Sequence, residues 1–194
     1  DDENSFLRGT CLNQARMAEP LGLTVAGLNV WDNMRLIDYL ATRGDIAMDD
    51  LGCFGFSGGG YMTLYLAALD PRVRKAFVSG YLYGVGDSLL HLNGNCSCNY
   101  TPGLWRLLDM GDIASLIAPR PLLVQSCEED HLNGSRGLKN VDEQLKIVRD
   151  AYKLLGRRDA LRHEVCPGGH HLGVTHLVED IEWLDSHVAK CDRA

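Results

Sequence analysis

The stretch "CFGFSGGGYM" constrains the fold most, because it places Ser57 between glycines directly after a short apolar run at 51–56. Such a run predicts a buried strand, and a helical pattern follows over 61–70. Between a strand and a helix, the pattern G-x-S-x-G indicates a nucleophile elbow, a tight turn that exposes the serine oxygen. We expect a Cβ at Gly55 or Gly59 to collide with the strand or the helix. The alternative is a glycine-rich loop with an incidental serine.

Strand-like and helical patterns alternate along the chain. Short apolar runs predict buried strands, and apolar residues three to four apart predict helices. Expected helices lie at 24–43, 61–70, 111–118, 139–155 and 175–191, and expected strands at 51–56, 73–81, 121–127 and 161–166. This order predicts an α/β fold with a mostly parallel sheet and helices on both faces. We expect residues 1–194 to form a single domain, with Asp112 capping the helix at 111–118.

Charge and hydropathy argue against two classes of partner. The net charge of −7 is opposite to the basic face that nucleic-acid binding needs. No stretch approaches 18 apolar residues, so we expect no membrane span.

Seven cysteines, an odd number, slightly favour a reducing, cytoplasmic compartment, whereas glycosylation sequons at Asn95, Asn99 and Asn133 are compatible with secretion. The sequence therefore leaves the compartment open.

A nucleophilic serine needs a base and an acid that orients the base. In this architecture both follow the serine, acid before base, on loops at the carboxyl ends of strands. The strand at 121–127 ends in "EEDH" and the strand at 161–166 ends in "PGGHH". We favour Asp130 as the acid, with Glu128 as the alternative, and His170 as the base over His171.

Four further expectations complete the site. The backbone N–H of Gly58 is expected to stabilise the oxyanion, and Trp105, just beyond a long loop at 82–104, to line a substrate pocket. We expect no metal, because Cys96-x-Cys98 lacks zinc-knuckle spacing and has no second pair, and adjacent histidines point apart. The serine chemistry requires no cofactor.

These motifs resemble the α/β-hydrolase superfamily, and within it the dienelactone-hydrolase-like and acetyl xylan esterase-like branch. The similar stretches include "GCFGFSGGGYMTLYLAALDPRV", "CSCNYTPGLW", "DMGDIASLIAPRPLLVQSCEEDHLNG" and "PGGHH". The resemblance implies that Ser57 is the nucleophile, Asp130 the triad acid and His170 the base of an esterase. The implied substrate is a small-molecule ester, such as an acetylated carbohydrate. A dienelactone hydrolase proper would have a cysteine at the position of Ser57.

The resemblance covers the C-terminal half of the family's fold. The family has several strands before the helix expected at 24–43, and a loop there supplies a second oxyanion donor. We therefore expect the elbow strand at an open sheet edge, covered by a missing N-terminal segment or by a second copy in a homo-oligomer. The alternative function is that of a non-catalytic or truncated hydrolase-fold protein that acts through binding or assembly. A thioesterase or peptidase also stays open, since specificity lies in the pocket walls.

Overall fold

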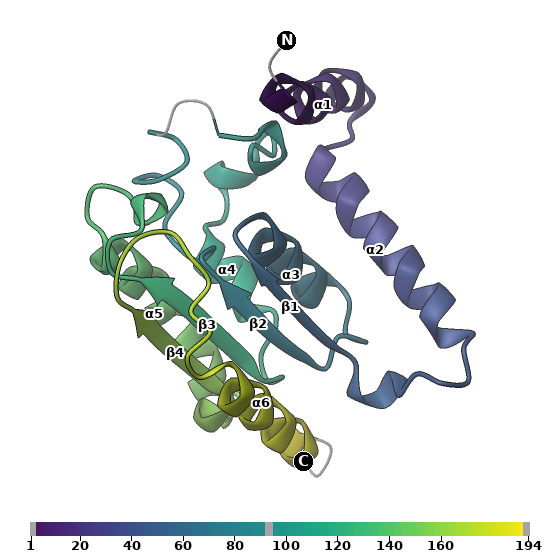
Figure 1. Ribbon diagram of the computed structural model, residues 1–194, viewed down its shortest axis with the longest axis vertical. Coiled ribbons are helices and arrows are strands. Elements are labelled where there is room, and N and C mark those ends of the chain that lie inside the picture. Colours follow the sequence, from purple (N-terminus) through teal and green to yellow (C-terminus); the bar gives the residue numbers. More distant parts are fainter. Residues whose placement is uncertain (1–2, 92–94, 192–194) are drawn as a thin grey trace.

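The computed structural model describes residues 3–91 and 95–191, which build a four-stranded parallel sheet (Figure 1). The strands are β1 (Gly52–Phe56), β2 (Lys75–Ser79), β3 (Leu122–Cys127) and β4 (Leu161–Cys166), and they neighbour one another in chain order. Each lies within one of the apolar runs that predicted it. Apolar residues on both faces of a strand are typical of a sheet that is covered twice.

Helices lie on both faces of this sheet, which confirms the expected α/β fold. They are α1 (Glu3–Ala18), α2 (Val25–Ala41), α3 (Gly58–Leu69), α4 (Met110–Ser115), α5 (Leu138–Leu154) and α6 (Leu177–Cys191). Short 3₁₀ turns η1 to η6 cover Glu19–Leu21, Met48–Asp50, Ser97–Asn99, Leu104–Arg106, His131–Asn133 and Arg158–Ala160. Helices α3 to α5 pack on one face, α2 covers α3, and α6 packs on the opposite face (Figure 1).

The larger core fills the space between the sheet and the helices α2 to α5. Its fully buried members include Leu64 on α3, Leu122 on β3 and Leu145 on α5. The smaller core, around Phe77 and Leu184, seals α6 against the other face. Each such side chain contributes about 1.5–3 kcal/mol through burial, so both faces help to hold the strands in register.

The register brings the carboxyl ends of all four strands to one edge. Phe56 at the end of β1 lies opposite Ser79, and Ser79 lies opposite Gln125 of β3. Strands β3 and β4 continue together for two more residues, to Cys127 and Cys166. The loops that follow β1, β3 and β4 therefore gather at this edge, where open α/β sheets bind their ligands.

Strand β1 forms one outer edge of the sheet. In the described part of the chain it pairs with β2 alone. The side chain of Phe54 on β1 is half exposed, and its ring lies 4.8 Å from that of Phe77. The elbow strand thus lies at an open edge of the described sheet. Of the described helices, none combines the length and the apolarity needed to cross a membrane.

The cap of α4 differs from the expectation. Asp109 is the N-cap, and its side chain accepts a hydrogen bond from the N–H of Met110 at 2.7 Å. Asp112 lies three residues later, where its Oδ2 accepts from the N–H of Asp109 at 2.8 Å. Asp112 is therefore the second member of a capping box and not the cap itself. The spacing D-x-x-D was the signal for this arrangement.

One stability prediction comes from His163, which lies on β4 with its Nε2 3.2 Å from Ser126 Oγ. Burial lowers the pKa of His163 to about 4. The unfolded chain takes up this proton near pH 6.5, so the stabilisation is complete above that pH and is lost as the pH falls toward 4. As the pH falls from 6.5 toward 4, we expect protonation of His163 to lower the free energy of unfolding by about 3 kcal/mol.

Urea unfolding at a series of pH values checks this prediction. The variant His163→Gln cannot be protonated, so its free energy of unfolding should depend less on pH between 6.5 and 4 than that of the unmodified protein. Identical pH dependence in the two proteins would contradict the assignment.

Candidate active site

Ser57 occupies a strained turn between β1 and α3. Its φ of 55° and ψ of −116° make it the one non-glycine residue with positive φ among those described. The turn is held by two backbone hydrogen bonds of 2.9 Å, from Ser57 N–H to the carbonyl of Ser79 and from Tyr61 N–H to the carbonyl of Ser57. Strain of this kind concentrates at functional sites. The glycine-rich stretch is therefore an ordered elbow.

The glycines around Ser57 have different roles. A Cβ on Gly55 would lie 2.1 Å from the carbonyl oxygen of Gly59, and one on Gly60 would lie 2.6 Å from that of Ser79. A Cβ on Gly59 would meet nothing within 4 Å, so the expectation that it would collide with the strand or the helix is wrong. Gly59 takes part in the close approach through its backbone carbonyl, whereas its Cβ direction is open. The elbow thus requires glycine at positions 55 and 60.

A pair of substitutions tests this difference. Gly55→Ala is expected to lower the free energy of unfolding by about 3 kcal/mol or more, because backbone must move to admit the methyl group. Gly59→Ala adds a methyl group inside a helix and is expected to be neutral or to stabilise by up to about 1 kcal/mol. Urea unfolding of both variants measures the contrast, and equal effects would contradict this reading of the turn.

The structure brings Ser57, His170 and Asp130 together. His170 Nε2 lies 2.8 Å from Ser57 Oγ, and His170 Nδ1 lies 2.7 Å from Asp130 Oδ2. The serine follows β1, the carboxylate follows β3, and the imidazole comes from the loop after β4, which arches over the sheet edge (Figure 1). Only 1% of the Asp130 side chain and 20% of the His170 side chain are exposed.

The two alternative residues lie elsewhere. Glu128 is exposed, and its N–H extends the sheet by donating to the carbonyl of Cys166 at 2.9 Å. His171 Nδ1 lies 2.8 Å from the carbonyl of Gly169, and no contact with Ser57 accompanies it among the described residues. A serine hydroxyl, an imidazole and a buried carboxylate in series can move a proton from the serine to the imidazole.

Local contacts orient both Asp130 and the imidazole of His170. Asp130 Oδ1 accepts from the N–H of Leu132 at 2.9 Å and caps the turn η5, which leaves Oδ2 for the imidazole. The ring centroid of Phe56 lies 4.7 Å from that of His170, and the His131 ring packs nearly perpendicular to His170 with the centroids 5.6 Å apart. The imidazole is therefore held on two sides while its two nitrogens face Ser57 and Asp130.

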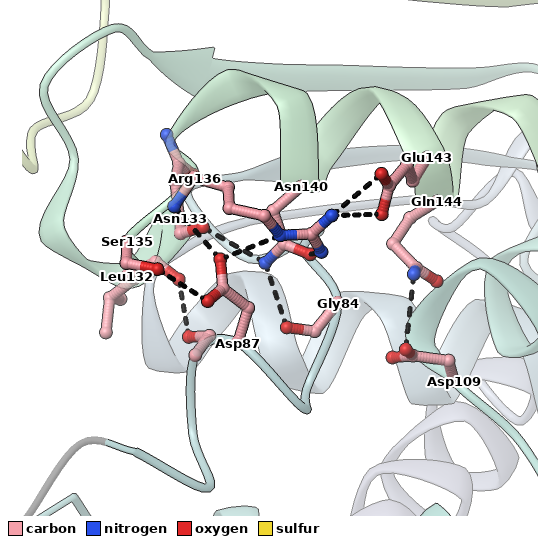
Figure 2. A network of polar contacts seen from close by, with 11 residues as sticks. Gly84, Asp87, Asp109, Leu132, Asn133, Ser135, Arg136, Asn140, Glu143 and Gln144 are labelled. Carbon is pink, nitrogen blue, oxygen red and sulfur yellow. Dashed lines mark hydrogen bonds and ion pairs between the residues drawn. The ribbon is translucent and has the colours of Figure 1, made fainter.

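Figure 2 shows the polar network behind the acid loop, by which we mean residues 128–137. Asn140 on α5 is buried and donates to the carbonyl oxygens of Gly84 at 2.9 Å and Asn133 at 3.0 Å. Asp87 accepts from Ser135 Oγ at 2.7 Å. The network ties the acid loop to α5 and to the loop after β2, so it fixes the position from which Asp130 reaches His170.

We expect Asn140→Ala to lower the free energy of unfolding by about 2–3 kcal/mol, because two buried carbonyl groups lose their donor. The acid loop loses an anchor, so the reactivity of Ser57 should also fall. Glu143→Gln is the matched control on the same helix, since its ion pair with Arg136 is exposed and contributes less than about 1 kcal/mol. Urea unfolding measures the change in stability, and the rate at which a fluorophosphonate probe labels Ser57 measures the change in reactivity. A loss in the control as large as that in Asn140→Ala would count against this role.

A cavity of about 290 Å³ opens beside Ser57. Aromatic, amide, thiol and aliphatic side chains wall it, from Tyr61, Tyr81, Tyr83, Asn95, Cys96, Cys98, Asn99 and Leu132. Burial raises the pKa of all three tyrosines, so their hydroxyls stay protonated. Tyr81 donates to Asn99 Oδ1, and Tyr61 donates to the carbonyl of Cys98 at 3.3 Å. The walls enclose a small, largely apolar space.

Two pocket features differ from the sequence analysis. Trp105 is not among the residues that wall the cavity, since its half-buried ring packs against the larger core instead. Packing against the larger core removes the apolar ring of Trp105 from water, which favours this position. The tyrosine wall was missed, although Tyr81 and Tyr83 follow β2 at the edge where ligands bind.

Gly58 lies at the first position of α3 and lines the same cavity as Ser57. The first N–H groups of a helix have no partner within the helix, and they form its positive end. The N–H of Gly58 therefore belongs to the positive end of α3, beside Ser57.

A parallel sheet whose first described strand turns sharply through a serine into a helix, with an acid and a histidine after later strands, defines the α/β-hydrolase fold. The chain therefore has the α/β-hydrolase fold. Residues 25–94 match the family model described as "Prolyl oligopeptidase family". The chain is 30% identical over 151 residues to the protein named "Putative hydrolase YtaP" of Bacillus subtilis (strain 168), covering 77% of this chain and 50% of that protein.

Solved structures show the same fold. A glucuronoyl esterase from Solibacter usitatus has a TM-score of 0.65 and 18% identity, covering 82% of this chain and 47% of that one. A protein described as a "putative acetyl xylan esterase" from Bacteroides fragilis NCTC 9343 has a TM-score of 0.64 and 20% identity, covering 78% and 39%. The chain thus spans about half the length of the curated relative that it matches.

Proposed function

We propose that this protein is a serine carboxylic-ester hydrolase in which Ser57, His170 and Asp130 form the catalytic triad. The continuous contact from Ser57 Oγ through His170 to Asp130, at 2.8 and 2.7 Å, carries the proposal. The strained elbow and the cavity beside Ser57 support it, because a nucleophile must reach a bound carbonyl.

The reaction proceeds through an acyl-enzyme. Ser57 Oγ attacks the ester carbonyl while His170 Nε2 takes its proton, and Asp130 stabilises the imidazolium. The N–H of Gly58 donates to the oxyanion of the tetrahedral intermediate. The intermediate collapses as His170 returns the proton to the departing alcohol, which leaves an ester on Ser57. Water then attacks this ester with His170 again as base, and the carboxylic acid and free Ser57 are released.

The substrate class that we propose is a carbohydrate ester with a small acyl group, such as acetyl. Three of the similar structures are described as esterases: a glucuronoyl esterase, a methylesterase and a putative acetyl xylan esterase. A cavity of about 290 Å³ suits a small acyl group, because it is slightly smaller than the about 300–1,000 Å³ of pockets for drug-sized ligands.

Treatment with a fluorophosphonate probe, followed by intact mass and peptide mapping, tests the proposal. We expect one adduct per chain, on Ser57, and none on the same chain after unfolding in urea. Folding is checked separately by a cooperative urea transition. A folded chain without an adduct would contradict the proposal and favour a hydrolase-fold protein that acts through binding or assembly.

A further inference from the structure

Three cysteine sulfurs meet where α1 touches the wall of the cavity. The Sγ atoms of Cys11, Cys96 and Cys98 all lie within 4.8 Å of one another. Cys11 comes from α1, and the other two flank the start of the turn η3, against which α1 packs. All three side chains are half-buried, and the described cysteines form no disulfide.

The spacing suits a metal ion. Zn²⁺ binds thiolates at about 2.3 Å in tetrahedral geometry, which separates two sulfur ligands by about 3.8 Å. The three sulfurs lie at most 4.8 Å apart, so small side-chain rotations would bring them to that distance. Three thiolates form a soft ligand set that selects zinc-like or cuprous ions over hard cations. We propose that Cys11, Cys96 and Cys98 bind one thiophilic metal ion, with Zn²⁺ as the expected ion.

Binding proceeds with loss of the three thiol protons to solvent, and the three sulfurs then donate to the ion. The fourth tetrahedral position is left to water or to a ligand from solution. A disulfide would use two of the sulfurs and leave the third unexplained. Convergence of all three, from segments far apart in the chain, is what a metal site requires.

The backbone of the Cys-x-Cys segment is already held in place. Asn95 Oδ1 accepts from the N–H of Cys96 at 3.1 Å, and Tyr61 donates to the carbonyl of Cys98 at 3.3 Å. The N–H of Asn99 donates to the carbonyl of Cys96 at 3.0 Å and closes the turn. Two ligands are therefore presented by a fixed turn, and Cys11 completes the set from α1.

The site adjoins the cavity without containing Ser57. Cys96 and Cys98 wall the cavity, so a bound ion would fasten α1 to that wall. The expectation of no metal came from the Cys96-x-Cys98 spacing, the lack of a second pair and the adjacent histidines, none of which gave a sign of Cys11. Metal binding does not depend on the proposed hydrolase activity, and Ser57→Ala should bind the ion as the unmodified protein does.

The first test uses the unmodified chain, reduced and freed of metal by a chelator, then alkylated with iodoacetamide with and without one equivalent of Zn²⁺. Peptide mapping gives the alkylation rate of each cysteine. We expect Zn²⁺ to slow alkylation of Cys11, Cys96 and Cys98 by about tenfold or more, since the ion holds the thiolate electron pair. Cys166 on β4 lies outside the cluster and is expected to react at an unchanged rate.

The second test compares variants. Cys11→Ser is expected to weaken Zn²⁺ binding, measured by competition with a chromogenic chelator, by more than about 100-fold, since losing even a supporting partner costs 10–100-fold. Cys166→Ser is the matched control and should bind Zn²⁺ as the unmodified protein does. Equal affinity in Cys11→Ser, or equal alkylation rates with and without Zn²⁺, would overturn the proposal. So would a Cys11 disulfide in the isolated protein whose reduced form binds no Zn²⁺.

Discussion

Ser57→Ala is expected to abolish labelling by the fluorophosphonate probe and to lower kcat for hydrolysis of p-nitrophenyl acetate by about 10⁶. The substitution removes the atom that forms the acyl-enzyme, while His170 and Asp130 keep their mutual contact of 2.7 Å. Alanine tolerates φ of 55° about as well as serine does, so the elbow should persist. Intact mass and initial rates measure the two effects, and urea unfolding verifies the fold.

Ser186→Ala is the matched control for this experiment. Ser186 is exposed on α6, on the opposite face of the sheet, and its hydroxyl makes local contacts, with the carbonyl of Trp183 at 2.8 Å and with Nδ1 of His187 at 3.0 Å. Its labelling and hydrolysis rates should equal those of the unmodified protein. If Ser57→Ala kept activity within about tenfold of the control, catalysis by Ser57 would be refuted.

Asp130→Asn is expected to lower kcat by about 10⁴, with little change in KM. The Oδ1 of asparagine can still accept from the N–H of Leu132, so the acid loop keeps its cap. The amide N–H₂, however, would face His170 Nδ1 and make that nitrogen an acceptor. The proton then lies on Nε2, and the imidazole cannot take the proton of Ser57. Steady-state kinetics and the rate of probe labelling should fall together.

Glu128→Gln separates the two candidate acids. Glu128 is exposed and lies two residues before Asp130, so its substitution should leave kcat within about twofold of the unmodified value, as for most surface changes. If Glu128→Gln lowered kcat as much as Asp130→Asn does, the assignment of Asp130 as the orienting acid would be contradicted.

Much of the fold was predictable because the signals are local. Each strand is an apolar run between turn residues, and Thr24 at the cap of α2 and the left-handed Gly156 after α5 mark helix boundaries. The parallel arrangement follows from the alternation of strands and helices. The capping error at Asp112 arose within one turn, where neighbouring aspartates compete for the same role.

The candidate site was predictable to the level of the loops. Topology places the loops after β1, β3 and β4 at one edge, but burial decides between Asp130 and Glu128, and burial is a tertiary property. The open space at Gly59 and the position of Trp105 likewise depend on packing directions that a single sequence does not encode locally. Cys11 joins Cys96 and Cys98 only because α1 packs on η3.

The long sequence separation between Ser57 and His170 has a consequence for the kinetics of folding. Ser57 follows one outer strand of the described sheet and His170 follows the other, and their contact joins residues 113 positions apart. Loops that long close late, because the entropic cost of closure precedes the gain from the contact. We therefore expect the contact between Ser57 and His170 to form only when all four strands align. During refolding, reactivity toward the probe reports native assembly of the whole sheet, whereas helix content recovers earlier.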